Sequence, residues 1–181
     1  YEALKELSKI TEIDIADNES ITELNPLAEL SDLRYLDCSG TKVSDINPIR
    51  NLNGIKELNI SDTEITDISN LKYANVVQNF KADNNKISDI SIVEYFKDLN
   101  YLSISGTDVS DISSLSNCEN ITKLNLSATL VNDITSLSNL FKLNDLDISN
   151  TYVNDLSALQ NIENLHFLNI EGTQVTDLSV I

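Results

Sequence analysis

The sequence predicts an α/β solenoid, in which the chain coils through about eight similar units that each supply a short strand and a short helical turn. Three segments carry this prediction, because they align when the chain is shifted by multiples of 22 residues: ISDTEITDISNLKY at 60–73, ISGTDVSDISSLSN at 104–117 and ISNTYVNDLSALQN at 148–161. The apolar spacing inside each segment fits neither a helix nor a strand period. It fits the inward points of a coil whose stacked units bury one shared ridge.

We expect a single domain over residues 1–181, because the repeat runs from end to end without a linker or a change in composition. Residues 1–9 are the tail of a further unit or part of a cap, since Leu4 matches Leu27. Solenoid ends need polar caps, and neither end supplies one, so we expect flanking sequence, disorder or pairing there. The last unit is truncated. The units start at Ile10, Leu33, Ile55, Val77, Leu99, Ile121, Leu143 and Leu165.

Each unit opens with the spacing L-x-x-L-x-L, which predicts a short strand whose alternate side chains turn inward. Phe80 and Ala82 fall in the same unit, so a large inward residue is offset by a small one. Cys38 and Cys118 occupy inward positions too far apart for a disulfide, so we expect both to be buried as small apolar residues. The first inward strand column is Ile13, Leu36, Leu58, Phe80, Leu102, Leu124, Leu146 and Leu168.

A polar column follows each strand and is expected to hydrogen-bond the backbone where the chain turns away. A polar-acid-apolar triplet, such as Ser110-Asp111-Ile112, comes next in every unit. We expect its polar residue to start a short helical turn and the acid to lie at that turn's positive end. The polar column is Asn18, Thr41, Thr63, Asn85, Thr107, Thr129, Thr151 and Thr173.

The full pattern, L-x-x-L-x-L-x-x-[NT]-x-[VI]-[ST]-D-[IL]-S-x-L-x-N, is clear in LNYLSISGTDVSDISSLSN at 99–117. It resembles the leucine-rich repeat family and, more narrowly, its 22-residue internalin-like class. The resemblance implies a right-handed superhelix with a concave parallel sheet and convex 3-10 turns. One departure is that the family's Asn column is mostly Thr here, with Asn only at 18 and 85.

Members of that class are typically bacterial cell-surface adhesins that bind host proteins on the concave face. A sister class comprises intracellular eukaryotic scaffolds that regulate phosphatases. On the concave face, the outward strand positions are free to vary, and aromatic residues there are typical binding anchors. The alternative is that these aromatic residues are scattered and have no common role. The expected ligand-binding residues are Tyr35, Glu57, Tyr101, Lys123, Asp145, Asp147, Tyr152 and Phe167.

The charge balance excludes some partners. The formal net charge is −17, from 12 Lys and Arg against 29 Asp and Glu, which disfavours nucleic acid and acidic membrane surfaces. A basic protein surface is compatible, although high charge also serves solubility. There is no apolar run long enough to span a membrane and no signal segment at the start of this sequence.

Catalytic and metal sites are not predicted. His166 is the single His, both Cys point inward, and no phosphate-binding loop or zinc spacing occurs. Two sets of acids are candidate Ca²⁺ ligands, Asp14 with Asp37, and Asp83 with Asp62 or Glu64, but no calcium-loop spacing accompanies them. We therefore expect no metal and no cofactor.

These observations together predict a non-catalytic protein-binding module, extracellular or on a bacterial cell surface, that recognises a protein ligand with its concave face. A glycan ligand is less favoured. The alternative is an intracellular leucine-rich repeat scaffold or phosphatase-regulator-like adaptor, which would be cytoplasmic. A hydrolase would need a catalytic domain outside this sequence.

Overall fold

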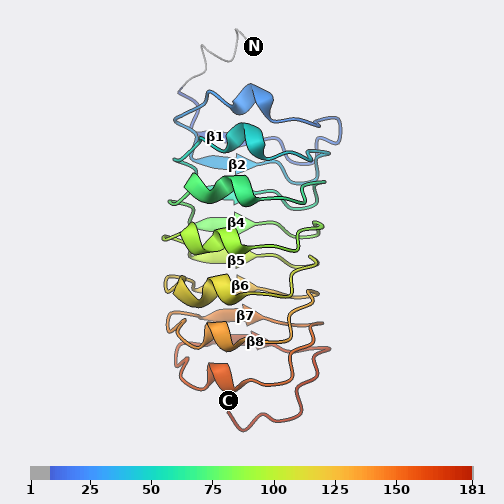
Figure 1. Ribbon diagram of the computed structural model, residues 1–181, viewed down its shortest axis with the longest axis vertical. Helices are drawn as coiled ribbons and strands as arrows, with labels where there is room; N and C mark the ends of the chain where they lie inside the picture. The colour runs from blue at the N-terminus through green and yellow to red at the C-terminus, as the bar shows by residue number, and fades with distance from the viewer. Residues whose placement is uncertain (1–8, 181) are drawn as a thin grey trace.

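The computed structural model describes residues 9–180, which form one parallel sheet of eight three-residue strands connected through 3-10 helices (Figure 1). The expected partial unit or cap at residues 1–9 falls almost wholly outside the described residues. The strands are β1 (Glu12–Asp14), β2 (Tyr35–Asp37), β3 (Glu57–Asn59), β4 (Asn79–Lys81), β5 (Tyr101–Ser103), β6 (Lys123–Asn125), β7 (Asp145–Asp147) and β8 (Phe167–Asn169). The 3-10 helices are η1 (Asn25–Leu27), η2 (Asn47–Ile49), η3 (Ser69–Tyr73), η4 (Ser91–Tyr95), η5 (Ser113–Asn117), η6 (Thr135–Leu137) and η7 (Ser157–Leu159).

The units stack in sequence order along the long axis, with the sheet on one side and the 3-10 helices on the other (Figure 1). Each strand pairs with the next one along the chain, so that Leu58 lies opposite Phe80 and Phe80 opposite Leu102. The predicted period of 22 residues is therefore the pairing register of the sheet. We call the outward side of the sheet the concave face and the side of the 3-10 helices the convex face.

The predicted inward columns form one continuous hydrophobic core. Leu36, Phe80 and Leu102 are fully buried, and the Phe80 ring meets Phe96 edge to face at 5.6 Å between centroids. Burying each such side chain contributes about 1.5–3 kcal/mol. Ile13 and Leu168 are only partly buried, because β1 and β8 are the outermost described strands.

The polar column that follows each strand hydrogen-bonds the backbone, as predicted. Thr107 Oγ1 donates to the carbonyl oxygen of Ile104 at 2.7 Å, and the other described Thr residues of the column repeat this contact. Asn85 reaches further, because its Nδ2 donates across to Ile60 O of the preceding unit at 2.8 Å. The Thr residues and Asn18 therefore close the turn within one unit, whereas Asn85 links two units.

From η2 to η7, the acid of the triplet, and not the polar residue before it, contacts the backbone at the start of the 3-10 helix. At η1, Glu23 Oε2 instead accepts from the side-chain Nδ2 of Asn25 at 2.7 Å. Asp111 Oδ1 accepts a hydrogen bond from the backbone N–H of Ser113, the first residue of η5, at 2.8 Å. Ser110 is exposed and lies three residues before that helix, so the expectation that it starts the turn is wrong. An ionised carboxylate is a stronger acceptor than a hydroxyl and stabilises the helix's positive end.

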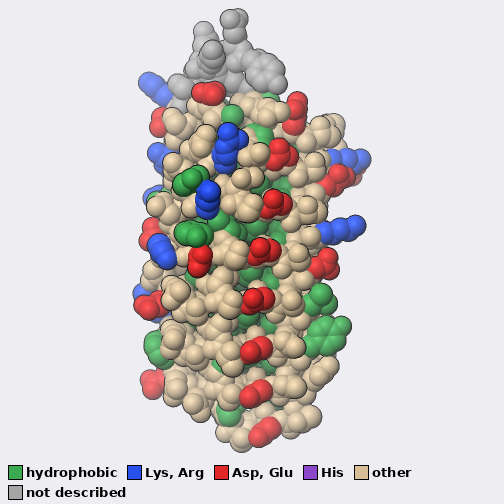
Figure 2. Space-filling view, in the orientation of Figure 1, with side chains coloured by type: hydrophobic (Ala, Val, Ile, Leu, Met, Phe, Trp, Pro, Cys, Tyr) green, Lys and Arg blue, Asp and Glu red, His purple; other side chains and the backbone are tan. Residues whose placement is uncertain are grey.

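The same contact recurs from Asp45 to Asp177, so the carboxylates form one line down the convex face (Figure 2). A backbone hydrogen bond from the residue two places on lowers the pKa of Asp67, Asp111, Asp133 and Asp177. The line is a structural feature of the unit, since each member satisfies its own backbone.

Both cysteines are buried and free, as expected. Burial raises the pKa of the Cys38 thiol to about 12 and that of the Cys118 thiol to about 11. Because the thiolate is the reactive form, neither Cys is a nucleophile at neutral pH.

Candidate functional site

Four expected ligand-binding residues stand in register across the concave face. Tyr101, Lys123, Asp145 and Phe167 are the first residues of β5, β6, β7 and β8, and each lies opposite the next. Lys123 Nζ lies 3.3 Å from Asp145 Oδ2, in the middle of the row. Phe167 is 50% exposed, although nothing in the packing of the unit requires an aromatic residue there. The row therefore places an ion pair between two aromatic side chains.

This row lines a shallow hollow of about 250 Å³, the C-terminal hollow, to which Leu124, Asn125 and Asp147 also contribute. Five of the eight expected residues are thus brought together: Tyr101, Lys123, Asp145, Asp147 and Phe167. The hollow thus combines two aromatic rings with charged side chains between them, an arrangement suited to a protein hot spot.

Tyr35 and Glu57 lie apart from this group, in a second hollow of about 50 Å³ over β2, β3 and β4. Burial and the negative charges of Asp37, Asp14 and Glu57 raise the pKa of Tyr35, so its hydroxyl stays a hydrogen-bond donor at neutral pH. Tyr35 Oη lies 3.4 Å from Asp37 Oδ2. We call this the N-terminal hollow.

Asp147 lines the C-terminal hollow, but its oxygens are already engaged. Its Oδ1 accepts from the backbone N–H and the hydroxyl of Ser149, at 2.9 and 2.6 Å, and its Oδ2 accepts from Asn169 Nδ2 at 3.1 Å. Asp37 repeats this arrangement with Ser39 and Asn59. Burial tends to raise the pKa of Asp37, but these hydrogen bonds outweigh it and hold the pKa low.

The second outward column is interrupted at two adjacent strands, where Lys81 and Ser103 replace Asp or Asn. Asp83 compensates, because its Oδ1 accepts from the Ser105 N–H at 2.7 Å and from Ser103 Oγ at 2.6 Å. Lys81 is freed from that structural task, and its Nζ lies 5.7 Å from the centre of the Tyr101 ring. Lys81 thus bridges the two hollows, since it lines one and contacts the Tyr of the other.

The sequence reasoning did not select Lys81, although a Lys in a column of Asp and Asn was a visible signal. It also missed Tyr73 and Tyr95, which are 56% and 47% exposed on η3 and η4 of the convex face. Both stand in a column that is Asn in most other units, so the departure could have been read from the repeat.

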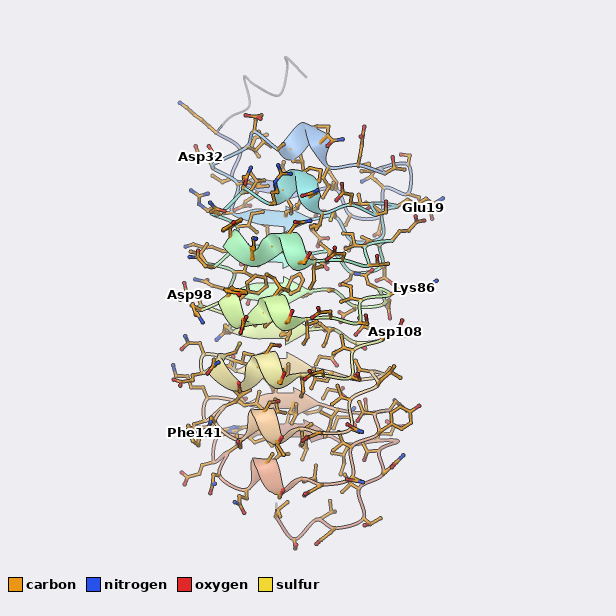
Figure 3. The ribbon with its side chains drawn as sticks, viewed as in Figure 1. Glu19, Asp32, Lys86, Asp98, Asp108 and Phe141 are labelled. Carbon is orange, nitrogen blue, oxygen red and sulfur yellow. The ribbon has the colours of Figure 1, made fainter. Side chains whose placement is uncertain are left out.

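Tyr152 belongs to a different surface. It lies at the edge where the chain leaves the sheet, and the groove that it lines includes no residue of either hollow. Figure 3 shows this edge at Lys86 and Asp108, opposite the edge that carries Asp98 and Phe141. The eight expected residues therefore fall on three separate surfaces.

Four of the five candidate Ca²⁺ ligands, Asp14, Asp37, Asp62 and Asp83, accept hydrogen bonds from protein donors. Asp62 Oδ1 accepts from Asn84 Nδ2 at 2.9 Å, and Asp14 Oδ1 accepts from the Ala16 N–H. Within residues 9–180 there is no group of three or more His, Cys, Asp and Glu side chains that could hold a metal ion. None of the helices described is long and apolar enough to cross a bilayer.

Comparisons with known proteins find the same repeat architecture. The family described as leucine-rich repeats (2 copies) matches residues 31–73. The structure of an internalin C2 from Listeria monocytogenes is similar with a TM-score of 0.90 and 30% identity, over 93% of this chain and 74% of that one. No curated protein sequence matches the chain.

Two more distant structures share the fold. A leucine-rich repeat protein of Leptospira interrogans has a TM-score of 0.90 at 19% identity, over 97% of this chain and 46% of that one. A plant peptide hormone receptor, solved in complex with RGF2, has a TM-score of 0.78 at 18% identity, over 92% of this chain and 29% of that one. The chain thus spans less than half of either protein.

Proposed function

The chain belongs to the internalin-like leucine-rich repeat proteins, and from this premise we propose that it is a bacterial cell-surface or secreted adhesin module that binds a protein ligand on its concave face. It has no catalytic role in this proposal. The observation that carries the proposal is the row across β5 to β8, in which Tyr101 and Phe167 flank the Lys123–Asp145 pair.

The row suits protein recognition because it is held by the backbone. Its four residues stand on paired parallel strands, so little conformational freedom is lost when a ligand binds. Tyr and Phe on such a surface supply apolar contact area, and the ion pair supplies direction. The receptor that was solved with its peptide shares this architecture, which is compatible with a protein ligand.

The acidic balance favours a ligand with a basic surface. Near the hollow, only Lys123 and Lys81 oppose the carboxylates Asp145 and Asp147. Affinity should therefore fall as salt rises, because exposed charges are screened over about 8 Å at physiological ionic strength. Affinity that stays constant with salt would assign recognition to the aromatic side chains alone.

The test measures binding of the fluorescently labelled chain to cultured epithelial cells by flow cytometry. Wild type should bind, and prior trypsin treatment of the cells should abolish binding, whereas glycosidase treatment should leave it unchanged. The double variant Tyr101→Ala/Phe167→Ala should bind at least tenfold more weakly, as expected for two hot-spot aromatic residues. Tyr95→Ala is the control, because Tyr95 lies on the convex face and is about as exposed as Phe167, at 47% against 50%.

The proposal is wrong if the double variant binds as well as wild type, or if trypsin-treated cells still bind. Loss of binding after glycosidase treatment would replace the protein ligand by a glycan.

A further inference from the structure

A lateral groove of about 750 Å³ runs along the edge where the chain passes from the sheet to η6 and η7. It is separate from both hollows of the concave face. Its lining residues are Asn132, Asp133, Ile134, Thr135, Tyr152, Asn154, Asp155, Ser157, Ala158 and Gln174. The groove is polar along most of its length, with Tyr152 as its one large exposed ring.

The side chains along this edge change from charged to apolar beside the lateral groove. The column that contains Tyr152 is charged in four consecutive units, as Lys42, Glu64, Lys86 and Asp108, and then becomes Leu130 and Tyr152. These two side chains are 46% and 53% exposed, and Figure 2 shows hydrophobic atoms on that edge beyond the charged ones. A charged column that turns apolar and aromatic while staying in solvent is not explained by packing.

The backbone holds this pair in place. Leu130 N–H donates to Val109 O and Tyr152 N–H donates to Val131 O, both at 2.9 Å, so each residue is tied to the unit before it. The Tyr152 ring is therefore presented on a fixed backbone, as a preorganised contact requires.

The groove also holds two carboxylates that no cation neutralises. Asp133 and Asp155 each use Oδ1 to accept the N–H at the start of η6 and η7, at 2.8 Å. Neither has a Lys or Arg within ion-pair distance, since the only ion pair among residues 9–180 joins Lys123 to Asp145. No Lys or Arg occurs anywhere in residues 143–181, so the negative potential of the groove is not balanced locally.

We propose that the lateral groove is a docking site for an Arg- or Lys-bearing segment of a partner protein, whose cationic side chain lies on the Tyr152 ring between Asp133 and Asp155. Arg suits the site best, because its flat guanidinium stacks on an aromatic ring while its N–H groups donate to carboxylates and amide oxygens. Asn132, Asn154 and Gln174 supply those amide oxygens. A neutral sugar would use the ring and the amides but not the two charges.

This inference does not rest on the adhesin proposal. The groove shares no residue with the C-terminal hollow, so either surface can fail its test while the other passes. The charges elsewhere on the convex face provide internal controls. Asp89 Oδ1 accepts the N–H at the start of η4, as Asp155 Oδ1 does at η7, but Asp89 does not line the groove. Asp155 Oδ2 also accepts from Ser157 Oγ at 3.0 Å.

The test is an NMR titration of the isotope-labelled chain with the blocked peptide acetyl-Gly-Arg-Gly-Arg-Gly-amide. Backbone amide shifts should concentrate at residues 132–135, 152–158 and 174. Tyr152→Ala should weaken binding two- to fivefold, which is the usual size of an exposed cation–π contact, and Tyr152→Phe should keep it. Asp155→Asn keeps the helix cap and should weaken binding, while Asp89→Asn should not.

Three results would overturn the proposal. Shifts spread evenly along the line of carboxylates from Asp45 to Asp177 on the convex face would indicate generic charge attraction. Equal binding of the citrulline peptide, which has the same shape without the charge, would show that no cation is recognised and would favour a neutral ligand such as a glycan. The absence of any shift at Tyr152 would leave the groove without this ligand. The spectrum of each variant also reports whether it is folded.

Discussion

Two columns of outward side chains on the same concave face have different roles. The first column, with Tyr101, Lys123, Asp145 and Phe167, changes from strand to strand and makes few bonds to the backbone. The second column, two residues further along each strand, is mostly Asp or Asn. Its members accept the N–H two residues on, as Asp147 does from Ser149. Outward orientation alone therefore does not identify a ligand-binding residue.

In this solenoid, outward residue types that recur in every unit are structural, whereas those that vary are candidates for recognition. A residue type that recurs in every unit has a structural role in every unit, whereas a residue that varies from unit to unit is free to contact one ligand. The interruption at Lys81 and Ser103 supports this, because Asp83 takes over the missing backbone contact there. A departure from a recurring column therefore identifies a candidate site.

The largest expected effect is a difference in stability between substitutions on the inward and outward faces of β5. Leu102 is fully buried, so Leu102→Ala should lower the free energy of unfolding by about 2–5 kcal/mol. Tyr101→Ala, one residue away and directed outward, should change it by less than about 1 kcal/mol. Urea unfolding followed by circular dichroism measures both. Equal losses would mean that Tyr101 is a core residue and not a free one.

The second-largest expected effect is a difference in stability between substitutions in the two outward columns. Asp147→Ala removes the acceptor of the Ser149 N–H, and Ser149 is buried, so we expect a loss of about 1–3 kcal/mol in the free energy of unfolding. Asp145→Ala should cost less than about 1 kcal/mol, since its pair with Lys123 is exposed. The same urea experiment measures both variants. If Asp145→Ala were the more destabilising, the division of the concave face would be wrong.

Much of this division could be read from the sequence. The inward columns and the Thr column follow from period and residue type alone, and the structure confirms that Leu36, Phe80 and Thr107 lie where expected. The role of the acid could not be read in the same way. Ser110 and Asp111 are adjacent and both can cap a helix, so only the backbone path decides which one reaches the Ser113 N–H.

Residues at the strand exit were the least predictable. Tyr152 follows Asn150, which has a φ of 55°, in the left-handed region. That conformation turns the chain out of the sheet, so a residue two places on no longer shares the strand's face. The eight expected ligand-binding residues follow from chemical type and position along the chain. Their division among two hollows and a groove depends on this turn and on the spacing of the strands.

A third, smaller effect tests another recurring column, the left-handed residue after each strand. Gly106 has a φ of 68°, and a methyl group there would lie 2.5 Å from Asn84 Oδ1. Gly106→Ala should therefore destabilise the fold by about 1–2 kcal/mol, while ligand binding at the hollow stays unchanged in the folded protein. Ala128 holds the same position with a φ of 53° and is the reciprocal control.

Ala128→Gly should be neutral or stabilising, because it relieves the left-handed strain, although it also frees the unfolded chain. Thermal unfolding of the two variants measures this reciprocity. Opposite signs support the view that the column serves the unit. A stabilising Gly106→Ala would contradict it.

The smallest expected effect is the pH dependence of stability that comes from the line of carboxylates on the convex face. The Ser113 N–H lowers the pKa of Asp111 in the folded chain, so the stabilisation from this contact is fully present above the unfolded pKa of about 4. It is lost as the pH falls through the lower, folded pKa. Asp111→Asn keeps an acceptor oxygen but cannot titrate, so its free energy of unfolding should fall less than that of wild type between pH 5 and pH 2.

The control is Asp108→Asn, which removes the same charge from the same unit but leaves the cap of η5 intact. Acidification also relieves the repulsion of a chain with a net charge of −17, and this contribution is common to both variants. The difference between Asp111→Asn and Asp108→Asn in urea midpoints at each pH therefore isolates the cap. If the two variants followed the same pH profile, the line of carboxylates would act through its overall charge and not through the N–H groups that it contacts.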